Sequence, residues 1–344
     1  MPMEKTYKIE MYGVSPEEQQ SLQNHFKEHG YNYAVNYYPN KIDSDFTNPT
    51  KDAEVLSVFV DSKVDAKVMD QFPNLSLIAT RSTGYDNIDL AEAKNRNITV
   101  CNVPSYGECT VAEYTFGLIL MLSRKIHIST NKFIELGLVT NSNIRGFDLN
   151  DKTIGIIGTG KIGKRVISIA RGFGMKVLAY DANPDKKIST ESGTQYVDLD
   201  HLLRHSDVVS LHVPYSKQTH HLINKDTLEM MKKTSILVNT SRGGIINTND
   251  LVEALNNGTI AGAGLDVLEE ENIIKDETAF IMSKDKSHHN LCTIVADHAL
   301  MSMPNVIITP HNAYNTIEAL DRILDTTTQN IIAWIQGKPI NIVD

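Results

Sequence analysis

The first hundred residues contain short apolar runs that alternate with polar segments. The runs Tyr7–Met11, Val55–Val60, Leu77–Ala79 and Thr99–Cys101 predict strands, because each is apolar and has turn-forming residues nearby. A polar helix is predicted at Leu90–Asn95, between the last two runs. This order of strands and helices predicts a small α/β unit with a parallel sheet.

The sequence Ser15-Pro16-Glu17-Glu18 predicts the start of a helix after the first strand. Ser15 suits the N-cap, Pro16 suits the first helical position, and Glu18 stands three residues after the cap, as in a capping box.

A long apolar segment follows the break at Val103-Pro104. It predicts a helix from Thr110 to Arg124 that is apolar around most of its circumference, so we expect it to be buried between domains or between subunits. From there to Asn150 the sequence is typical of a loop.

A second and stronger α/β series begins at Lys152. Its short apolar runs predict strands at Thr153–Ile157, Lys176–Tyr180, Val208–Val213, Ser235–Asn239, Gly262–Val267 and Val306–Thr309. Helices are predicted at Lys161–Phe173, Asp198–His205 and Thr248–Asn256, and a long last helix runs from Ile317 to Gly337. Together with the length of 344 residues, the two series predict two domains.

The composition excludes several classes of protein. Hydrophobic residues make up 41% and charged residues 22%, which is typical of globular domains. Lys and Arg total 33 against 42 Asp and Glu, so the net charge is −9. Because phosphate binding needs clustered cations, and no Lys/Arg cluster is present, we expect no nucleic-acid partner.

The cysteines Cys101, Cys109 and Cys292 have neither disulfide nor zinc spacing, so we expect buried free thiols and no metal. The polar N-terminus lacks the apolar core of a signal peptide. The longest apolar stretch, Tyr114–Leu122, is too short for a membrane span of ~20 residues. The expectation is a cytoplasmic protein with no membrane partner.

The sequence Gly158-Thr159-Gly160-Lys161-Ile162-Gly163 has the GxGxxG pattern of a dinucleotide-binding turn, and it lies between a predicted strand and a predicted helix. Gly158 permits the turn, Gly160 lets the backbone approach a pyrophosphate, and Gly163 lets the helix pack on the strand. Asp181 ends the next strand and stands 18 positions after Gly163. A carboxylate at this place can bind the diol of a ribose, and it repels a 2′-phosphate. NAD is therefore predicted rather than NADP. The alternative is a glycine-rich turn with a chance acid.

Two further residues follow predicted strands at their carboxyl ends, where open α/β sheets bind ligands. Arg242 offers a planar guanidinium that suits a carboxylate, and His311 offers an imidazole for acid–base work. An acid from the run Glu269-Glu270-Glu271 is placed to stabilise the imidazolium. Each also has a simpler interpretation, as a surface arginine, a structural histidine or a solvated acidic face, and the spacing alone does not choose among the three acids.

With these residues the chain resembles the D-isomer-specific 2-hydroxyacid dehydrogenases, particularly the D-lactate dehydrogenase branch, over nearly its whole length. The motifs that carry the resemblance, besides the Gly158–Gly163 turn, are Arg81-Ser82-Thr83-Gly84-Tyr85-Asp86, Asn102-Val103-Pro104-Ser105-Tyr106-Gly107, Asn239-Thr240-Ser241-Arg242-Gly243, Gly264-Leu265-Asp266-Val267 and Thr309-Pro310-His311-Asn312-Ala313. Two departures are Leu268 in place of an aromatic residue and the absence of proline after Glu271.

The resemblance implies a role for each position. Arg242 binds substrate, His311 is the proton donor, and Glu271, which stands 29 positions after Arg242, pairs with His311. Thr83, Gly84 and Tyr106 contact the substrate. The implied NAD-binding positions are Gly158, Gly160, Lys161, Ile162, Gly163, Asp181, Val213, Pro214, Thr219, Thr240, Ser241 and Asp266.

The resemblance also implies two Rossmann-like or flavodoxin-like parallel-sheet domains. The NAD-binding domain, residues 104–311, is inserted into a discontinuous substrate domain, residues 1–103 plus 312–344, with the active site expected in a cleft between them. The helix at Thr110–Arg124 is expected to form a homodimer interface.

The implied function is an NAD-dependent D-lactate dehydrogenase that reduces pyruvate. The alternatives within the enzyme class act on larger 2-keto acids, hydroxypyruvate, glyoxylate or 3-phosphoglycerate. An alternative of another class is an NAD-sensing binding protein of the corepressor type. His288, His289 and His298, in the long segment 272–304, are interpreted as loop residues.

Overall fold

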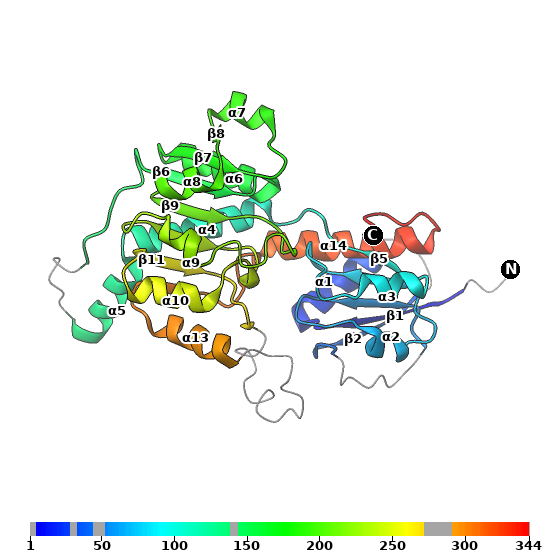
Figure 1. Ribbon diagram of the computed structural model, residues 1–344. Coiled ribbons are helices and arrows are strands. Elements are labelled where there is room, and N and C mark those ends of the chain that lie inside the picture. The colour runs from blue at the N-terminus through cyan, green and yellow to red at the C-terminus, as the bar shows by residue number, and fades with distance from the viewer. Residues whose placement is uncertain (1–4, 28–32, 44–51, 138–143, 272–290, 344) are drawn as a thin grey trace. The chain divides into compact units, whose positions relative to one another are not determined.

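The computed structural model describes residues 5–27, 33–43, 52–137, 144–271 and 291–343 (Figure 1). The chain divides into unit 1, which comprises Met1–Tyr106 and Asn315–Asp344, and unit 2, which comprises Gly107–Tyr314. Each boundary of these units lies three residues after the expected boundary.

Unit 1 is built on a parallel five-stranded sheet of order β2-β1-β3-β4-β5. Its strands are β1 (Tyr7–Tyr12), β2 (Tyr33–Tyr38), β3 (Val55–Val58), β4 (Leu77–Thr80) and β5 (Thr99–Cys101). Its helices are α1 (Pro16–Lys27), α2 (Ala66–Asp70), α3 (Leu90–Asn95) and α14 (Ile317–Ile335). This strand order is that of flavodoxin-like folds.

Two apolar cores cover the two faces of this sheet. One joins alternate strand residues such as Ile9 and Leu77 to Leu22 of α1 and Leu324 of α14. The other joins the opposite residues to α2 and α3. The predicted helix start is confirmed, because Ser15 N–H donates to Glu18 Oε2 at 2.8 Å and Glu18 N–H donates to Ser15 Oγ at 3.2 Å.

Unit 2 is built on a parallel seven-stranded sheet of order β12-β11-β10-β9-β6-β7-β8. Its strands are β6 (Thr153–Ile157), β7 (Lys176–Tyr180), β8 (Gln195–Tyr196), β9 (Val208–Leu211), β10 (Ile236–Asn239), β11 (Gly262–Leu265) and β12 (Val306–Ile308). Its helices are α4 (Glu108–Ser123), α5 (Ile126–Leu136), α6 (Lys161–Gly172), α7 (Lys186–Ser192), α8 (Leu199–His205), α9 (Lys225–Glu229), α10 (Thr248–Asn256) and α13 (Leu291–Ser302).

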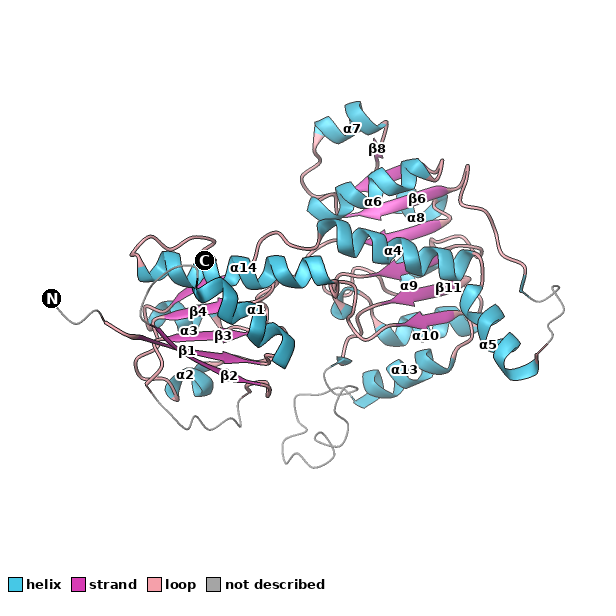
Figure 2. Ribbon diagram, turned by 180° about the vertical axis from the view of Figure 1, so that it is seen from behind, coloured by secondary structure: helices cyan, strands magenta, loops and turns pink. Residues whose placement is uncertain are grey.

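The strand order of unit 2 reverses between β6 and β9, which is the topological switch point where doubly wound sheets bind nucleotides. Helices α4 and α6 cover one face of the sheet (Figure 2), and α8, α9 and α10 cover the other face (Figure 1). The predicted α/β fold class with two parallel sheets is confirmed.

Helix α4 is buried by its own unit. Residues including Phe116, Leu118 and Leu122 are buried against α6 and the strands β10, β11 and β12. Its apolar circumference therefore has an explanation within one chain, and the expected burial between domains or subunits is not needed to account for it.

Three expectations for unit 2 and the cysteines are wrong. Helix α5 occupies part of the segment that was expected to be a loop up to Asn150. His298 lies on helix α13 rather than in a loop, and His288 and His289 lie outside the described residues. Only Cys101 is buried, whereas Cys109 and Cys292 are exposed, although all three are free thiols.

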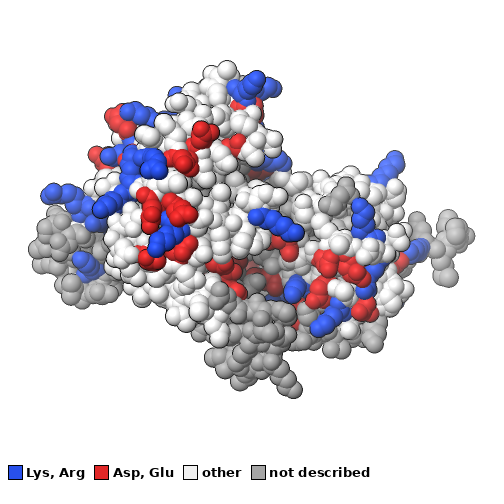
Figure 3. Space-filling model, in the orientation of Figure 1, with Lys and Arg blue, Asp and Glu red and all other residues white. Residues whose placement is uncertain are grey.

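The surface carries both signs of charge. On the face that Figure 3 draws, Lys and Arg side chains lie among Asp and Glu side chains. Within the part of the chain that the structure describes, no helix is both long enough and apolar enough to cross a membrane.

Candidate active site

The glycine-rich turn joins β6 to α6 at the switch point. Gly158 has φ +96°, and a Cβ there would lie 2.6 Å from the carbonyl carbon of His212. A Cβ on Gly163 would lie 2.1 Å from Gly158 O, so the helix packs tightly on the turn. Gly160, the N-cap of α6, faces open space, since no atom lies within 4 Å of where its Cβ would be. The turn therefore leaves an open space at the amino-terminal end of α6, which fits a pyrophosphate.

Asp181 follows β7 and lies against this turn. Its Oδ2 accepts hydrogen bonds from Thr159 N–H at 2.7 Å and Thr159 Oγ1 at 2.9 Å, and its Oδ1 accepts one from Asn183 N–H at 2.8 Å. Although partial burial acts to raise the pKa of Asp181, these hydrogen bonds hold it below its usual range. Because a carboxylate has about four acceptor positions, one remains for a ribose hydroxyl.

Tyr196 is a member of this network that sequence reasoning missed. Its hydroxyl donates to Thr159 Oγ1 at 2.9 Å and accepts from Asp185 N–H at 3.2 Å. The sequence contains no local pattern that indicates this contact, because Tyr196 lies 37 positions after Thr159. Only the pairing of β8 with β7 brings the two residues close together.

The other predicted coenzyme positions line the loops after β9 and β10. Ser241 Oγ donates to Val213 O and joins the two loops, whereas Thr219 Oγ1 donates to Pro214 O at 2.7 Å within the loop after β9. The Thr240 hydroxyl lies 2.9 Å from Thr115 Oγ1 of α4 and is buried.

Two predicted positions in the first turn of α6 point in different directions. The ammonium of Lys161 lies 4.0 Å from the Glu108 carboxylate, whereas Ile162 packs against an apolar core. Their backbone N–H groups belong to the first turn of the helix, and the positive end of the helix dipole there attracts anions.

His311 follows β12 and forms a pair with Glu271. Its Nδ1 lies 2.7 Å from Glu271 Oε1, and both side chains are only partly exposed. Because a carboxylate only accepts hydrogen bonds, Nδ1 carries the proton, which leaves Nε2 for a ligand. The backbone of His311 is in the left-handed region, with φ +54°.

Asp266 holds the strained backbone at His311. Its carboxylate accepts hydrogen bonds from Thr309 Oγ1 at 2.6 Å, Asn312 N–H at 2.8 Å and Ala313 N–H at 2.9 Å. His311 N–H also donates to Asp266 O at 2.8 Å. Burial raises the pKa of Asp266 above its usual range, although these hydrogen bonds act in the opposite direction. Asp266 thus fixes the position of the imidazole from the end of β11.

The structure distinguishes the three consecutive acids by their partners. Glu269 lies 2.6 Å from His221 Nε2 and accepts from Thr248 Oγ1 at 2.9 Å, whereas Glu271 contacts His311. Of these two carboxylates, the one predicted to pair with His311 is the one that does so.

Asp297 is a buried acid near this run that no sequence pattern singled out. It lies on α13, and its side chain is buried. Burial raises its pKa to about 7, a hydrogen bond from the Glu270 backbone acts in the opposite direction, and the neighbouring carboxylates of Glu269–Glu271 raise it further.

Arg242 follows β10 in a turn that the neighbouring side chains hold. Asn239 Nδ2 donates to Arg242 O at 2.9 Å, and Asn239 Oδ1 accepts from Ser241 N–H at 3.0 Å. Gly243 passes so close to the backbone of Leu268 that a Cβ would lie 2.0 Å from it. The turn therefore needs glycine after Arg242, and it contacts the segment that carries Glu271.

Arg242, Glu271 and His311 follow the neighbouring strands β10, β11 and β12 at one edge of the sheet. Since adjacent strands are ~4.8 Å apart, the ends of β10 and β12 are about 10 Å apart. The carboxyl ends of these strands therefore present a guanidinium and an imidazole–carboxylate pair. The guanidinium can bind a small carboxylate, and the pair can transfer a proton.

Thr83, Gly84 and Tyr106 lie in unit 1. Thr83 Oγ1 donates to Val103 O at 2.7 Å, Ser82 Oγ donates to Gly84 O at 2.6 Å, and Arg322 Nε donates to Tyr106 O at 2.7 Å. Unit 1 is described by itself, so the substrate contacts of these residues stay predictions.

Arg81 is a buried residue of unit 1 whose role the sequence did not reveal. Its guanidinium donates to Ser57 Oγ at 3.1 Å, Tyr12 O at 2.6 Å and Gly13 O at 2.7 Å, and it is 1% exposed. Arg81 therefore anchors the segment that leads to Thr83 and Gly84.

Residues 116–313 match the NAD-binding domain of the D-isomer specific 2-hydroxyacid dehydrogenases. A glyoxylate reductase of Thermococcus litoralis is 36% identical over 302 residues, 86% of this chain and 84% of the relative. A D-lactate dehydrogenase of Curvularia clavata is 39% identical over 291 residues, 83% and 80% respectively.

A solved structure gives the same picture for the fold. The D-lactate dehydrogenase of Aquifex aeolicus, complexed with NAD and lactic acid, superimposes with a TM-score of 0.85 at 37% sequence identity, covering 96% of each chain.

Proposed function

The chain belongs to the D-isomer specific 2-hydroxyacid dehydrogenases, and from this premise we propose that it is a D-lactate dehydrogenase, which reduces pyruvate with NADH to D-lactate and NAD⁺. The family makes it an NAD-dependent oxidoreductase. The observation that carries the proposal is the His311–Glu271 pair at 2.7 Å, on the same sheet edge as Arg242.

The residues of the chain divide the chemistry among themselves. NADH, when bound, supplies the hydride that the carbonyl carbon receives. The Arg242 guanidinium binds the substrate carboxylate and polarises the carbonyl. The His311 imidazolium gives the Nε2 proton to the carbonyl oxygen, which becomes the hydroxyl, and Glu271 stabilises the imidazolium through Nδ1. In the oxidation direction the same imidazole accepts the proton.

The residues at the switch point fit the coenzyme. The open space at Gly160 suits the pyrophosphate, and the remaining acceptor position of Asp181 suits a ribose hydroxyl. We assign unit 2 as the coenzyme domain and unit 1 as the substrate domain, with Thr83, Gly84 and Tyr106 as predicted substrate contacts.

Glyoxylate is the second candidate substrate. Several relatives at similar identity are named glyoxylate reductases, including those of Thermococcus litoralis and Thermofilum pendens. The chemistry assigned to Arg242, Glu271 and His311 serves either substrate, so the size of the acyl group that the site accepts decides between them.

A steady-state NADH-oxidation screen tests the substrate. It compares pyruvate, glyoxylate, hydroxypyruvate, 2-ketobutyrate and phenylpyruvate, with chiral analysis of the hydroxy acid formed. We expect the highest kcat/KM with pyruvate and D-lactate as product. A higher kcat/KM with glyoxylate, or L-lactate as product, would reject the D-lactate assignment. Tight NADH binding without turnover of any 2-keto acid would favour the binding-protein alternative.

His311→Ala tests the proton donor. We expect the rate of pyruvate reduction at pH 7 to fall by about 10²–10⁴-fold, because the developing alkoxide loses its acid. His298→Ala, on the exposed side of α13, is the control and should reduce pyruvate at the wild-type rate. A His311→Ala variant with a near-normal rate would remove His311 from this role.

A further inference from the structure

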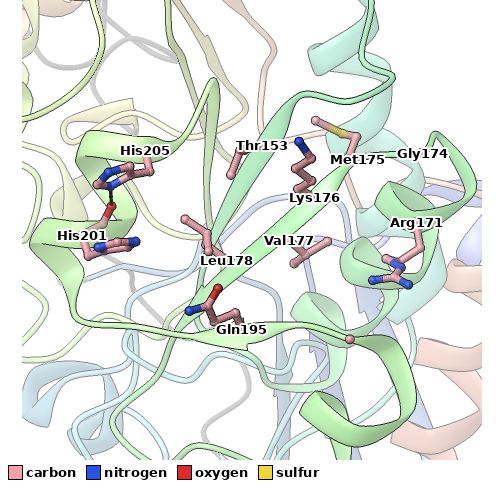
Figure 4. A pocket seen from close by; sticks show the side chains of 11 residues that line it. Thr153, Arg171, Gly174, Met175, Lys176, Val177, Leu178, Gln195, His201 and His205 are labelled. Carbon is pink, nitrogen blue, oxygen red and sulfur yellow. Dashed lines mark hydrogen bonds between the residues drawn. The ribbon is translucent and has the colours of Figure 1, made fainter.

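A cavity lies in unit 2 at the amino ends of the strands β6, β7 and β8, and none of the residues assigned to coenzyme or substrate lines it. It has a volume of about 610 Å³. Residues from the strand starts, the end of α6, the segment before β8 and helix α8 line it, namely Thr153, Arg171, Gly174, Met175, Lys176, Val177, Leu178, Gly193, Gln195, His201 and His205 (Figure 4).

This amino-end cavity is separate from the glycine-rich turn. Thr153 and Lys176 begin the strands β6 and β7, whereas the turn and Asp181 follow the opposite ends of these strands. A five-residue strand is about 16 Å long, so a ligand of ordinary size in the cavity does not reach the coenzyme turn.

The charged side chains of the cavity are all basic. Arg171 and Lys176 line it together with two imidazoles, and no carboxylate is among its lining residues. Among the described residues neither cation has a hydrogen-bond or ion-pair partner. The nearby carboxylate of Asp207 is already bound, since it accepts from Thr153 N–H and from Lys232 Nζ, each at 2.9 Å. The cavity thus offers positive charge without an internal counterion.

Two glycines shape the cavity for the guanidinium. Gly193 has φ +63°, and a Cβ there would lie 3.0 Å from Arg171 Nη1, so the guanidinium rests over a residue that has no side chain. Gly174, with φ +71°, would place a Cβ 2.3 Å from Asn150 Oδ1. Figure 4 shows Arg171 on one side of the cavity and the two histidines of α8 on the other, with Lys176 and Gln195 between them.

The imidazoles and the apolar residues that line the cavity favour an organic ligand. The rings of His201 and His205 are stacked with centroids 4.0 Å apart, and His205 Nδ1 lies 2.8 Å from His201 O. Met175, Val177 and Leu178, which also line the cavity, are buried. The volume is several times that of a phosphate ion and lies within the range of about 300–1,000 Å³ for small-molecule sites.

We propose that the amino-end cavity binds a small phosphate-bearing molecule, whose phosphate lies between Arg171 and Lys176 and whose remaining part packs against the histidine pair. A divalent metal is the competing ligand for two histidines four residues apart, but the adjacent Arg171 and Lys176 repel a cation. The site is independent of the proposed reaction, since it shares no residue with it.

Isothermal titration with inorganic pyrophosphate tests the site. The full-length protein is held in saturating NADH, so that the Gly158–Gly163 turn is occupied and does not contribute binding heat. We expect one saturable site, and Arg171→Gln and Lys176→Gln should each weaken binding about tenfold, as the loss of one charge-assisted contact does. Lys233→Gln, an exposed cation outside the cavity, is the matched control and should bind as the wild type does.

All three variants should unfold at the wild-type temperature and reduce pyruvate at the wild-type rate, because the cavity lies outside the catalytic residues. Two results would overturn the proposal. One is equal pyrophosphate affinity in the wild type and the Arg171→Gln/Lys176→Gln double variant. The other is the absence of saturable pyrophosphate binding up to about 10 mM, and Zn²⁺ binding that His201→Gln abolishes would then identify a metal as the ligand.

Discussion

At the scale of single residues, the consecutive acids after β11 have separate partners. Glu269 binds His221 and Thr248, and Glu271 binds His311. The two carboxylates stand two positions apart and each contacts an imidazole, so they form a matched pair for mutagenesis. An effect on pyruvate reduction that a Glu271 variant shows and a Glu269 variant does not is therefore attributed to the contact of Glu271 with His311.

Glu271→Gln should narrow the pH range of pyruvate reduction. The amide keeps the shape of the carboxylate but withdraws its charge, so the imidazolium of His311 loses its stabilisation and the rate declines at a lower pH than in the wild type. The measurement is kcat/KM for pyruvate from pH 5 to pH 9. Glu269→Gln is the control and should leave unchanged the pH at which the rate of pyruvate reduction declines. Identical shifts in both variants would contradict the assignment.

Asp297 makes stability depend on pH. Its pKa of about 7 in the folded protein exceeds the usual value of about 4 in an unfolded chain, so the folded state holds the proton more tightly. The contribution to stability is therefore fully present below pH 4 and is lost as the pH rises from about 4 to 7.

Asp297→Asn removes this dependence, because the amide is neutral throughout. We expect the variant to gain on the order of 4 kcal/mol relative to the wild type as the pH rises from 4 to 8, which corresponds to the difference between a pKa of about 4 and one of about 7. Urea unfolding at several pH values measures it, with the exposed Asp200→Asn as the control. A constant difference between variant and wild type across this range would show that Asp297 does not titrate in the folded state.

At the scale of elements, helix α6 has two different ends. Its amino end, at Gly160, faces open space beside the glycine-rich turn, and its carboxyl end, at Arg171 and Gly172, borders the amino-end cavity. Both Gly160 and Gly172 have room for a Cβ, since no atom lies within 4 Å of either position. They allow the same substitution to be compared at the two ends.

Gly160→Ala should weaken NADH binding without unfolding the protein. The added methyl group meets no protein atom but occupies the space assigned to the pyrophosphate, so the Kd for NADH should rise about tenfold or more. Fluorescence titration with NADH measures the Kd, and thermal unfolding checks the fold. Gly172→Ala should change neither quantity. Equal NADH affinity in both variants would mean that the pyrophosphate does not approach Gly160.

At the scale of the whole molecule, the surface of unit 2 has an apolar region on α5. Ile126, Phe133 and Ile134 are 47%, 63% and 76% exposed, and they follow α4 directly in the sequence. Exposed apolar residues that cluster on one element are typical of interfaces. The homodimer expected through the helix at Thr110–Arg124 stays a prediction. Since α4 is buried by its own unit, the exposed apolar residues of the following helix α5 are the surface on which a test of the dimer is best placed.

Ile134→Asp should convert a dimer into monomers. A charge at the centre of an apolar interface is desolvated without a partner, which costs several kcal/mol and exceeds what most interfaces tolerate. Light scattering coupled to size-exclusion chromatography gives the mass, expected at twice 38.3 kDa for the wild type. Ile317→Asp, at an isoleucine that is 85% exposed on α14, is the control. A monomeric wild type would reject the dimer.

The local features of this protein follow from its sequence. The strands β6 and β7, the helix start at Ser15 and the glycine-rich turn with Asp181 were all predictable, because each depends on residues within about 30 positions. Alternation of apolar runs and helices also determined the fold class, since parallel strands need crossover helices.

Other features depended on residues that are distant in sequence. Several contacts arise only when separate elements pack together. They are the partners of Glu269 and Glu271, the anchoring of Arg81, the contact of Tyr196 with Thr159 and the burial of Asp297. Helix α4 is a further example. Its apolar circumference indicated that it is buried, but it did not indicate which surface covers it.

The sequence by itself therefore determined which chemical groups the protein has and at which strand ends they stand. The tertiary structure decided which of these groups meet, because hydrogen bonding and burial between distant elements depend on strand order and helix packing rather than on spacing. Two examples are the contact of His311 with Glu271 at the carboxyl ends of the strands and the cavity at the amino ends that Arg171 and Lys176 both line.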